Sequence, residues 1–139
     1  MYRILAIDYG QKNIGLALSD PMRLFSKPFK TINNNGIEFI ITELCEIIRS
    51  QSVGKIVLGL PLSVAGLDTQ KTNEVREFYE ALAKRVDVPV ILWDERYTTA
   101  DAKEILIKKG LSIRDSKKVI DQTAAALILK SYLEGNKDA

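Results

Sequence analysis

The sequence predicts an α/β domain with a mixed five-stranded sheet and helices on both faces of that sheet. Short apolar runs separated by turn residues open the chain, and strand-like runs then alternate with longer segments whose apolar residues recur at helical spacing. Strands joined by short turns pair antiparallel, whereas strands joined through a helix pair parallel. With 139 residues, we expect one domain that spans residues 1–139.

The first part of the chain is expected to supply four strands and one helix. Residues 4–7 and 14–19 have the composition of a hairpin, because turn-forming residues separate two apolar runs. A third strand is expected near residues 27–32. Apolar residues at helical spacing then predict a helix over 37–48, and a buried strand follows over 55–60.

The second part continues the alternation of helix and strand. Apolar spacing predicts a helix over residues 75–86, and an apolar run predicts a strand over 88–93. Thr98 has the sequence context of a helix start and Gly110 that of a helix end, which predicts a helix between them. The last helix is expected over residues 115–133.

Several classes of site are excluded by composition. The chain has no histidine and one cysteine, Cys45, so it cannot form a Ser–His–Asp triad, a Cys–His pair, a Cys/His zinc site or an intrachain disulfide. Cys45 lies beside the apolar face of the first helix and is expected in the core. The lack of a disulfide and of a long apolar run favours a cytoplasmic protein without a membrane contact. The net charge of +2 is compatible with nucleic-acid binding but does not demonstrate it.

Acidic residues follow two of the predicted strands, where α/β sheets usually bind ligands. Asp8 ends the first strand, and Asp94 with Glu95 ends the fifth. Residues 59–61 end the fourth strand at the same edge. An aspartate after a strand also starts turns, so Asp8 alone is equally compatible with a local role.

Asp121 lies inside the last predicted helix, where aspartate is unfavourable. The small residues Ala124 and Ala125 would allow close packing on the sheet and bring Asp121 towards the strand ends. The alternative is an ordinary helix ion pair with Lys117 or Lys118. Three converging carboxylates would repel one another unless a cation neutralised them, and Mg²⁺ or Mn²⁺ prefers such oxygen ligands. This cofactor could support phosphodiester cleavage without histidine.

Four motifs, taken together, resemble a known family over nearly the whole chain. They occur in the family's order at residues 8–20, 59–66, 94–99 and 121–126. The chain resembles the YqgF-type, Holliday-junction-resolvase-like family, whose members are regarded as nucleases that process the 5′ end of pre-16S ribosomal RNA. The resemblance implies a ribonuclease H-like fold.

The resemblance also implies a catalytic and metal-binding triad of Asp8, Glu95 and Asp121. Asn13 stands where the family usually has arginine, which would weaken a phosphate contact there or move it to Lys12. The loop after Pro61 also departs from the family pattern at two positions. These are Ser63 and Ala65.

The remaining site predictions concern contacts with the substrate. Arg96 could hold a phosphate or neutralise Asp94, and Thr98 could bind a phosphate or cap a helix. Lys118 belongs to a basic cluster near Asp121, although such charges also occur on helix ends without a partner. The predicted substrate-binding residues are Gly10, Lys12, Gly59, Pro61, Arg96, Thr98, Thr99 and Lys118.

These observations favour a metal-dependent nuclease, or phosphodiesterase, that acts on a structured ribosomal RNA precursor as a monomer or weak homodimer. Three alternatives remain open at this stage. The same chemistry could act on branched DNA, or the chain could be a non-catalytic nucleic-acid-binding module in ribosome biogenesis. The Asp8–Gly10 opening also resembles the phosphate hairpin of actin-like sugar kinases, although this chain has the size of one of their two domains.

Overall fold

The computed structural model describes residues 1–96 and 113–135, and within the last helix it describes side chains from Thr123 onward. The strands are β1 (Arg3–Tyr9), β2 (Asn13–Ser19), β3 (Ser26–Asn33), β4 (Val53–Leu60) and β5 (Val90–Asp94). The helices are α1 (Ile37–Ser50), α2 (Gln70–Arg85) and α4 (Ile113–Gly135). The helix predicted between Thr98 and Gly110 lies outside the described residues.

The five strands form one mixed sheet in the order β3-β2-β1-β4-β5. The β1–β2 and β2–β3 pairs are antiparallel, whereas the β1–β4 and β4–β5 pairs are parallel. Short connections join the antiparallel strands, and α1 and α2 provide the crossovers to β4 and β5. The predicted arrangement of the sheet is therefore confirmed, and β1, β4 and β5 end at one edge.

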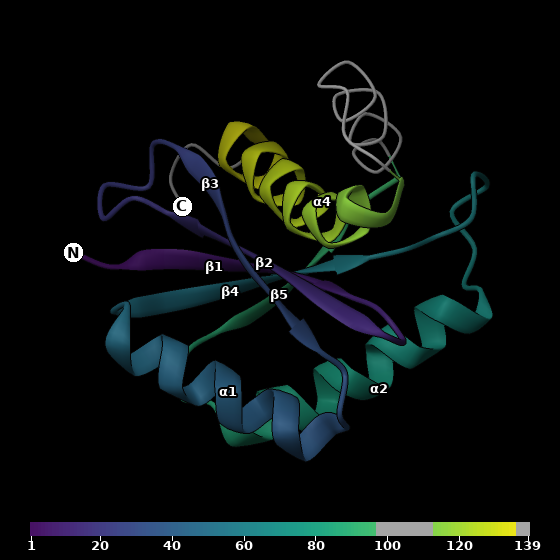
Figure 1. The fold of residues 1–139 in the computed structure, drawn as a ribbon, viewed down its shortest axis with the longest axis horizontal. Coiled ribbons are helices and arrows are strands. Elements are labelled where there is room, and N and C mark those ends of the chain that lie inside the picture. Colours follow the sequence, from purple (N-terminus) through teal and green to yellow (C-terminus); the bar gives the residue numbers. More distant parts are fainter. Residues whose placement is uncertain (97–112, 136–139) are drawn as a thin grey trace.

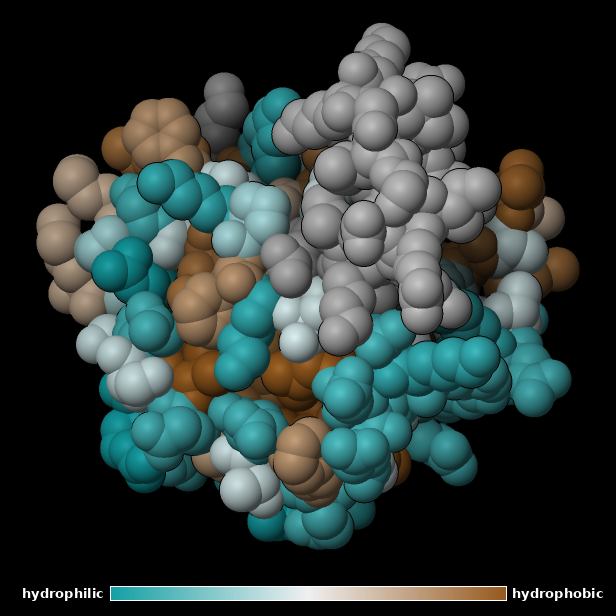
Figure 2. Space-filling model, in the orientation of Figure 1, coloured by the Kyte–Doolittle hydropathy of each residue, from teal (hydrophilic) through white to brown (hydrophobic). Residues whose placement is uncertain are grey.

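Helices cover both faces of the sheet, as expected (Figure 1). Successive residues of a strand point to opposite faces, so Leu5 and Ile7 pack on the α1–α2 side while Ile4 and Ala6 pack beneath α4. The space-filling view shows mainly hydrophilic side chains over the helices on the α1–α2 side, with apolar atoms visible between the elements (Figure 2). Two apolar layers therefore fix the sheet between the helices.

Cys45 corrects one expectation, because its side chain is exposed rather than part of the core. The buried residues of α1 are Ile40, Ile41, Leu44 and Ile47. Position 45 follows Leu44 by one residue, a rotation of roughly 100° that moves it away from the buried stripe.

The start of α2 was also missed by the apolar spacing. The helix begins at Gln70, because Thr69 and Thr72 form a capping box in which each side chain bonds the other residue's backbone N–H. The spacing of apolar residues predicted a start only at position 75. No helix among the described residues has the length and apolar character needed to cross a membrane.

Candidate active site

Two predicted acids, Asp8 and Glu95, lie at the edge where the parallel strands end. Asp8 is the penultimate residue of β1, and Glu95 directly follows β5. The Glu95 backbone N–H donates to the Leu60 carbonyl at 3.2 Å, which extends the pairing of β4 with β5 by one step. Both acids are thus attached to a rigid sheet and not to a long loop.

The Glu95 side chain is buried, with 5% of its surface exposed. Its carboxylate lies above Gly59 of β4, since a Cβ atom at position 59 would stand only 2.4 Å from Glu95 Oε2. β4 separates β1 from β5 in the sheet. The missing side chain at Gly59 therefore leaves the space in which Glu95 crosses β4.

Burial, and to a smaller extent the negative charges of Asp8 and Asp94, raise the pKa of Glu95 to about 7. The positive charge of Lys71 acts in the opposite direction and lowers this pKa. The electrostatic effect of Asp8 shows that the two carboxylates are close enough to repel each other. A cation bound between them would remove this repulsion.

Asp94 and Glu95 are neighbours in sequence but have different environments. Arg96 forms an ion pair with Asp94 at 2.7 Å, and its hydrogen bond to that carboxylate lowers the pKa of Asp94. Arg96 also donates to the Val64 carbonyl at 3.4 Å. Of the two roles considered for Arg96, the structure shows the neutralisation of Asp94, and its phosphate contact stays a prediction.

The third predicted acid, Asp121, lies on α4, and its side chain is outside the described part of the chain. Position 121 lies four residues before Ala125 and seven before Ile128, so it is on the same face of α4 as these two residues. Both Ala125 and Ile128 pack on the sheet. Figure 1 shows the N-terminal end of α4 near the edge where β1 and β4 end. Among the side chains that the structure describes, no group of three acids is placed to hold a metal.

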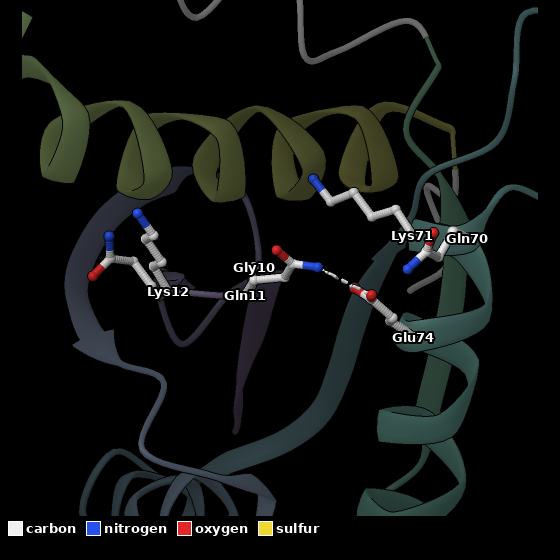
Figure 3. Close-up of a pocket in the computed structure, with 7 residues that line it drawn as sticks. Gly10, Gln11, Lys12, Gln70, Lys71 and Glu74 are labelled. Carbon is white, nitrogen blue, oxygen red and sulfur yellow. Dashed lines mark hydrogen bonds between the residues drawn. The ribbon is translucent and has the colours of Figure 1, made fainter.

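A pocket of about 510 Å³ lies beside this edge, between the β1–β2 turn and the start of α2 (Figure 3). Gln11 Nε2 donates to both carboxylate oxygens of Glu74, at 3.1 and 3.4 Å, and so connects the turn to the helix. The pocket is lined by Gly10, Gln11, Lys12, Asn13, Gln70, Lys71 and Glu74. It therefore contains two of the predicted substrate-binding residues, Gly10 and Lys12.

Gly10 also has a local structural role, because a Cβ atom there would lie 2.5 Å from the Asn13 carbonyl oxygen. Pro61 accepts a hydrogen bond from the Thr72 hydroxyl and so fastens the loop after β4 to α2. Ser63 accepts the Leu67 N–H on its hydroxyl oxygen at 3.0 Å. Substrate contacts by Gly10 and Pro61 stay predictions.

Two further substrate predictions, Thr98 and Thr99, lie outside the described residues. Lys118 belongs to α4, but its side chain is not among those described.

The family model named RuvX, described as a Holliday junction resolvase, matches residues 2–135. The chain belongs to the RuvX family. A relative from Maridesulfovibrio salexigens is 44% identical, and the match covers 94% of this chain and 97% of the relative. A relative from Lachnospira eligens is 38% identical, and the match covers 97% of this chain and 99% of the relative. Both relatives are named "Putative pre-16S rRNA nuclease". The predicted nuclease family is confirmed.

Solved structures agree with the predicted ribonuclease H-like fold of this RuvX member. Thermus thermophilus RuvC in complex with a Holliday junction superposes with a TM-score of 0.61 at 12% identity, covering 97% of this chain and 96% of RuvC. The fowlpox virus resolvase in complex with junction DNA gives a TM-score of 0.59 at 13% identity, and the match covers 96% of this chain and 97% of the resolvase. At such identities the similarity concerns the fold alone.

Sequence reasoning missed Lys71, Gln11 and Glu74 as residues of the site. Gln11 and Glu74 are 63 positions apart, and no sequence motif links them. Lys71 looks like an ordinary charged residue in the first turn of a helix. Only the packing of α2 beside the β1–β2 turn brings the three together.

Proposed function

We propose that this RuvX-family chain is a divalent-metal-dependent nuclease that cleaves a phosphodiester bond near the 5′ end of pre-16S ribosomal RNA. The observation that carries the proposal is the buried Glu95 carboxylate held close to Asp8 at the carboxyl ends of β5 and β1. The names of the relatives support a ribosomal RNA precursor as the substrate. This substrate would place the protein in the cytoplasm.

The donor set fits Mg²⁺ or Mn²⁺. Asp8 and Glu95 provide carboxylate oxygens only, and burial together with the negative charge of Asp8 disfavours the charged form of Glu95 without a counter-ion. We propose that Asp121 completes the set from α4. The ion would activate water and stabilise the charge that develops on the phosphate oxygens.

The residues of the chain have distinct tasks in this proposal. The attachment of Asp8 and Glu95 to strand ends keeps the carboxylates in place before the substrate binds. Gly59 leaves the space that the Glu95 side chain occupies. Arg96 neutralises Asp94, so that this acid does not add a full negative charge where a phosphate must approach.

The test compares purified chain on a pre-16S RNA fragment and on a four-way DNA junction, each with Mg²⁺, with Mn²⁺ and with EDTA. Asp8→Asn serves as the control for a contaminating nuclease. We expect metal-dependent cleavage of the RNA that the Asp8→Asn variant lacks. Cleavage in EDTA would contradict the mechanism.

The family description favours a second candidate function, the resolution of DNA junctions. Cleavage of the junction alone would support that candidate and contradict the RNA substrate. Binding without any cleavage would instead support a non-catalytic nucleic-acid-binding module. Sedimentation of the same preparation would test the predicted monomer or weak homodimer.

A further inference from the structure

Lys71 projects into the pocket between the β1–β2 turn and α2 from the first turn of α2. Its exposed side chain extends across the pocket towards Gln11 (Figure 3). Its charge also acts on the buried Glu95 carboxylate, so the pocket and the acid pair are neighbours. Lys71 is therefore a cation that lines an open pocket and lies within electrostatic range of the proposed catalytic Glu95.

The ordinary explanation for Lys71 is an ion pair with Glu74, three residues later on the same helix. The structure shows a different arrangement. Glu74 accepts both of its hydrogen bonds from the Gln11 amide, at 3.1 and 3.4 Å. Within the part of the chain that the structure describes, the Lys71 ammonium forms neither an ion pair nor a hydrogen bond.

Size and charge indicate what the pocket could take. Its volume of about 510 Å³ is within the range of roughly 300–1,000 Å³ for sites that enclose small molecules, which suits one nucleotide of a longer strand. Lys12 and Lys71 contribute two positive charges and Glu74 one negative charge. An open, net positive pocket of this size next to the acid pair suits a phosphodiester strand.

We propose that this pocket holds the nucleotide beside the scissile phosphate, and that Lys71 contacts the backbone phosphate of that nucleotide. The inference rests on the proposed nuclease function and adds to it the course that the RNA strand follows over the surface. The Gln11–Glu74 hydrogen bond holds the Glu74 carboxylate against the β1–β2 turn and away from Lys71. Lys71 therefore stays available to the substrate. Gln11 is in this sense a positioning residue.

The test measures binding of a fluorescent pre-16S RNA fragment to the full chain carrying Asp8→Asn, which prevents cleavage. Each lysine–phosphate contact adds about 0.7–0.9 to the slope of log Kd against log salt. We expect Lys71→Ala to lower the slope by about that amount and to weaken binding several-fold at low salt. Lys84→Ala, at the exposed opposite end of α2, is the matched control and should change neither quantity.

Gln11→Ala supplies a second, independent measurement. It removes no charge, yet it frees Glu74 to pair with Lys71, so we expect weaker binding in the same direction as Lys71→Ala. Circular dichroism and thermal melting check that each variant is folded. The cleavage rate is measured separately with Lys71→Ala in a chain that keeps Asp8. A lowered cleavage rate together with an unchanged salt slope would overturn the inference, because Lys71 would then act only on Glu95.

The result also separates this inference from the proposed function. If the wild-type chain cleaves the RNA while Lys71→Ala, added to the Asp8→Asn chain, keeps the full salt slope, the proposed contact of Lys71 with the RNA is wrong and the nuclease proposal stands. If the wild-type chain binds neither the RNA nor the junction, both proposals are wrong.

Discussion

The Glu95 carboxylate occupies the space that a side chain at position 59 would need: a Cβ atom on Gly59 would lie 2.4 Å from Glu95 Oε2 and 2.6 Å from Ile128 Cδ1. The first contact involves the proposed active site and the second involves the packing of α4. One absent side chain on β4 therefore allows both the buried acid and the close approach of the helix.

Gly59→Ala should displace Glu95 and impair cleavage more than it impairs folding. Overpacking of this kind costs about 1–3 kcal/mol of stability, which chemical denaturation would measure. In a Glu95→Ala background the methyl group no longer meets a carboxylate, so we expect a smaller cost there. Equal costs in both backgrounds, determined by a double-mutant cycle, would contradict a direct clash between Gly59 and Glu95.

Without metal, Glu95→Gln should gain stability over the wild type, and this gain should be larger at pH 8 than at pH 5. The pKa of Glu95 is raised from 4.5 to about 7 in the folded state, so the contribution of Glu95 to stability is fully present below pH 4.5 and is lost as the pH rises through 7. The loss is on the order of 3 kcal/mol at pH 8. Glutamine is neutral throughout and should remove this dependence.

Melting curves in EDTA at several pH values would measure this difference, with exposed Glu80→Gln as the control. Added Mg²⁺ should stabilise the wild type at pH 8 and should stabilise Glu95→Gln much less. A wild type whose melting temperature does not fall between pH 5 and pH 8 would contradict the raised pKa of Glu95.

Arg96→Ala distinguishes the two roles considered for this residue. The Arg96–Asp94 pair is partly exposed, so its loss should cost only about 0–1 kcal/mol of stability. If Arg96 also contacts a phosphate, the variant should bind RNA with a reduced salt slope, and Arg96→Lys should restore part of it. An unchanged slope would leave Arg96 with the neutralisation of Asp94 alone.

The sheet could be predicted from the sequence because its signals are local. Apolar runs between turn residues define β1, β2 and β4, and the change to helical spacing after Gly36 defines α1. The end of a strand is also a local feature, which is why Asp8 and Glu95 could be selected as site residues. Cys45 was misplaced because a one-residue step on a helix is enough to leave the buried stripe.

The contacts between distant segments could not be predicted in this way. The fit of Glu95 over Gly59 depends on the parallel pairing of β4 with β5, and the Gln11–Glu74 bond depends on where α2 packs. Neither relationship leaves a periodic pattern in the sequence. Resemblance to a family supplied the choice of Glu95 over Asp94, and the ion pair of Asp94 with Arg96 now gives a physical reason for it.

Asp121→Asn tests whether the acid on α4 belongs with Asp8 and Glu95. If Asp121 is a metal ligand, the amide keeps the size of the side chain but removes the charge that holds the cation. Cleavage should then fall by orders of magnitude. Without metal, the variant should be as stable as the wild type or more stable, because one source of carboxylate repulsion is gone.

The alternative ion pair with Lys117 or Lys118 predicts the opposite behaviour. Its loss would cost about 0.2–0.5 kcal/mol of stability and leave cleavage unchanged. Cleavage rates and melting temperatures with and without Mg²⁺ would distinguish the two cases, and Lys117→Ala would show the cost of losing the pair from its other side. A folded Asp121→Asn variant with wild-type activity would remove Asp121 from the proposed metal site, because no ligand that holds the cation can lose its charge without effect.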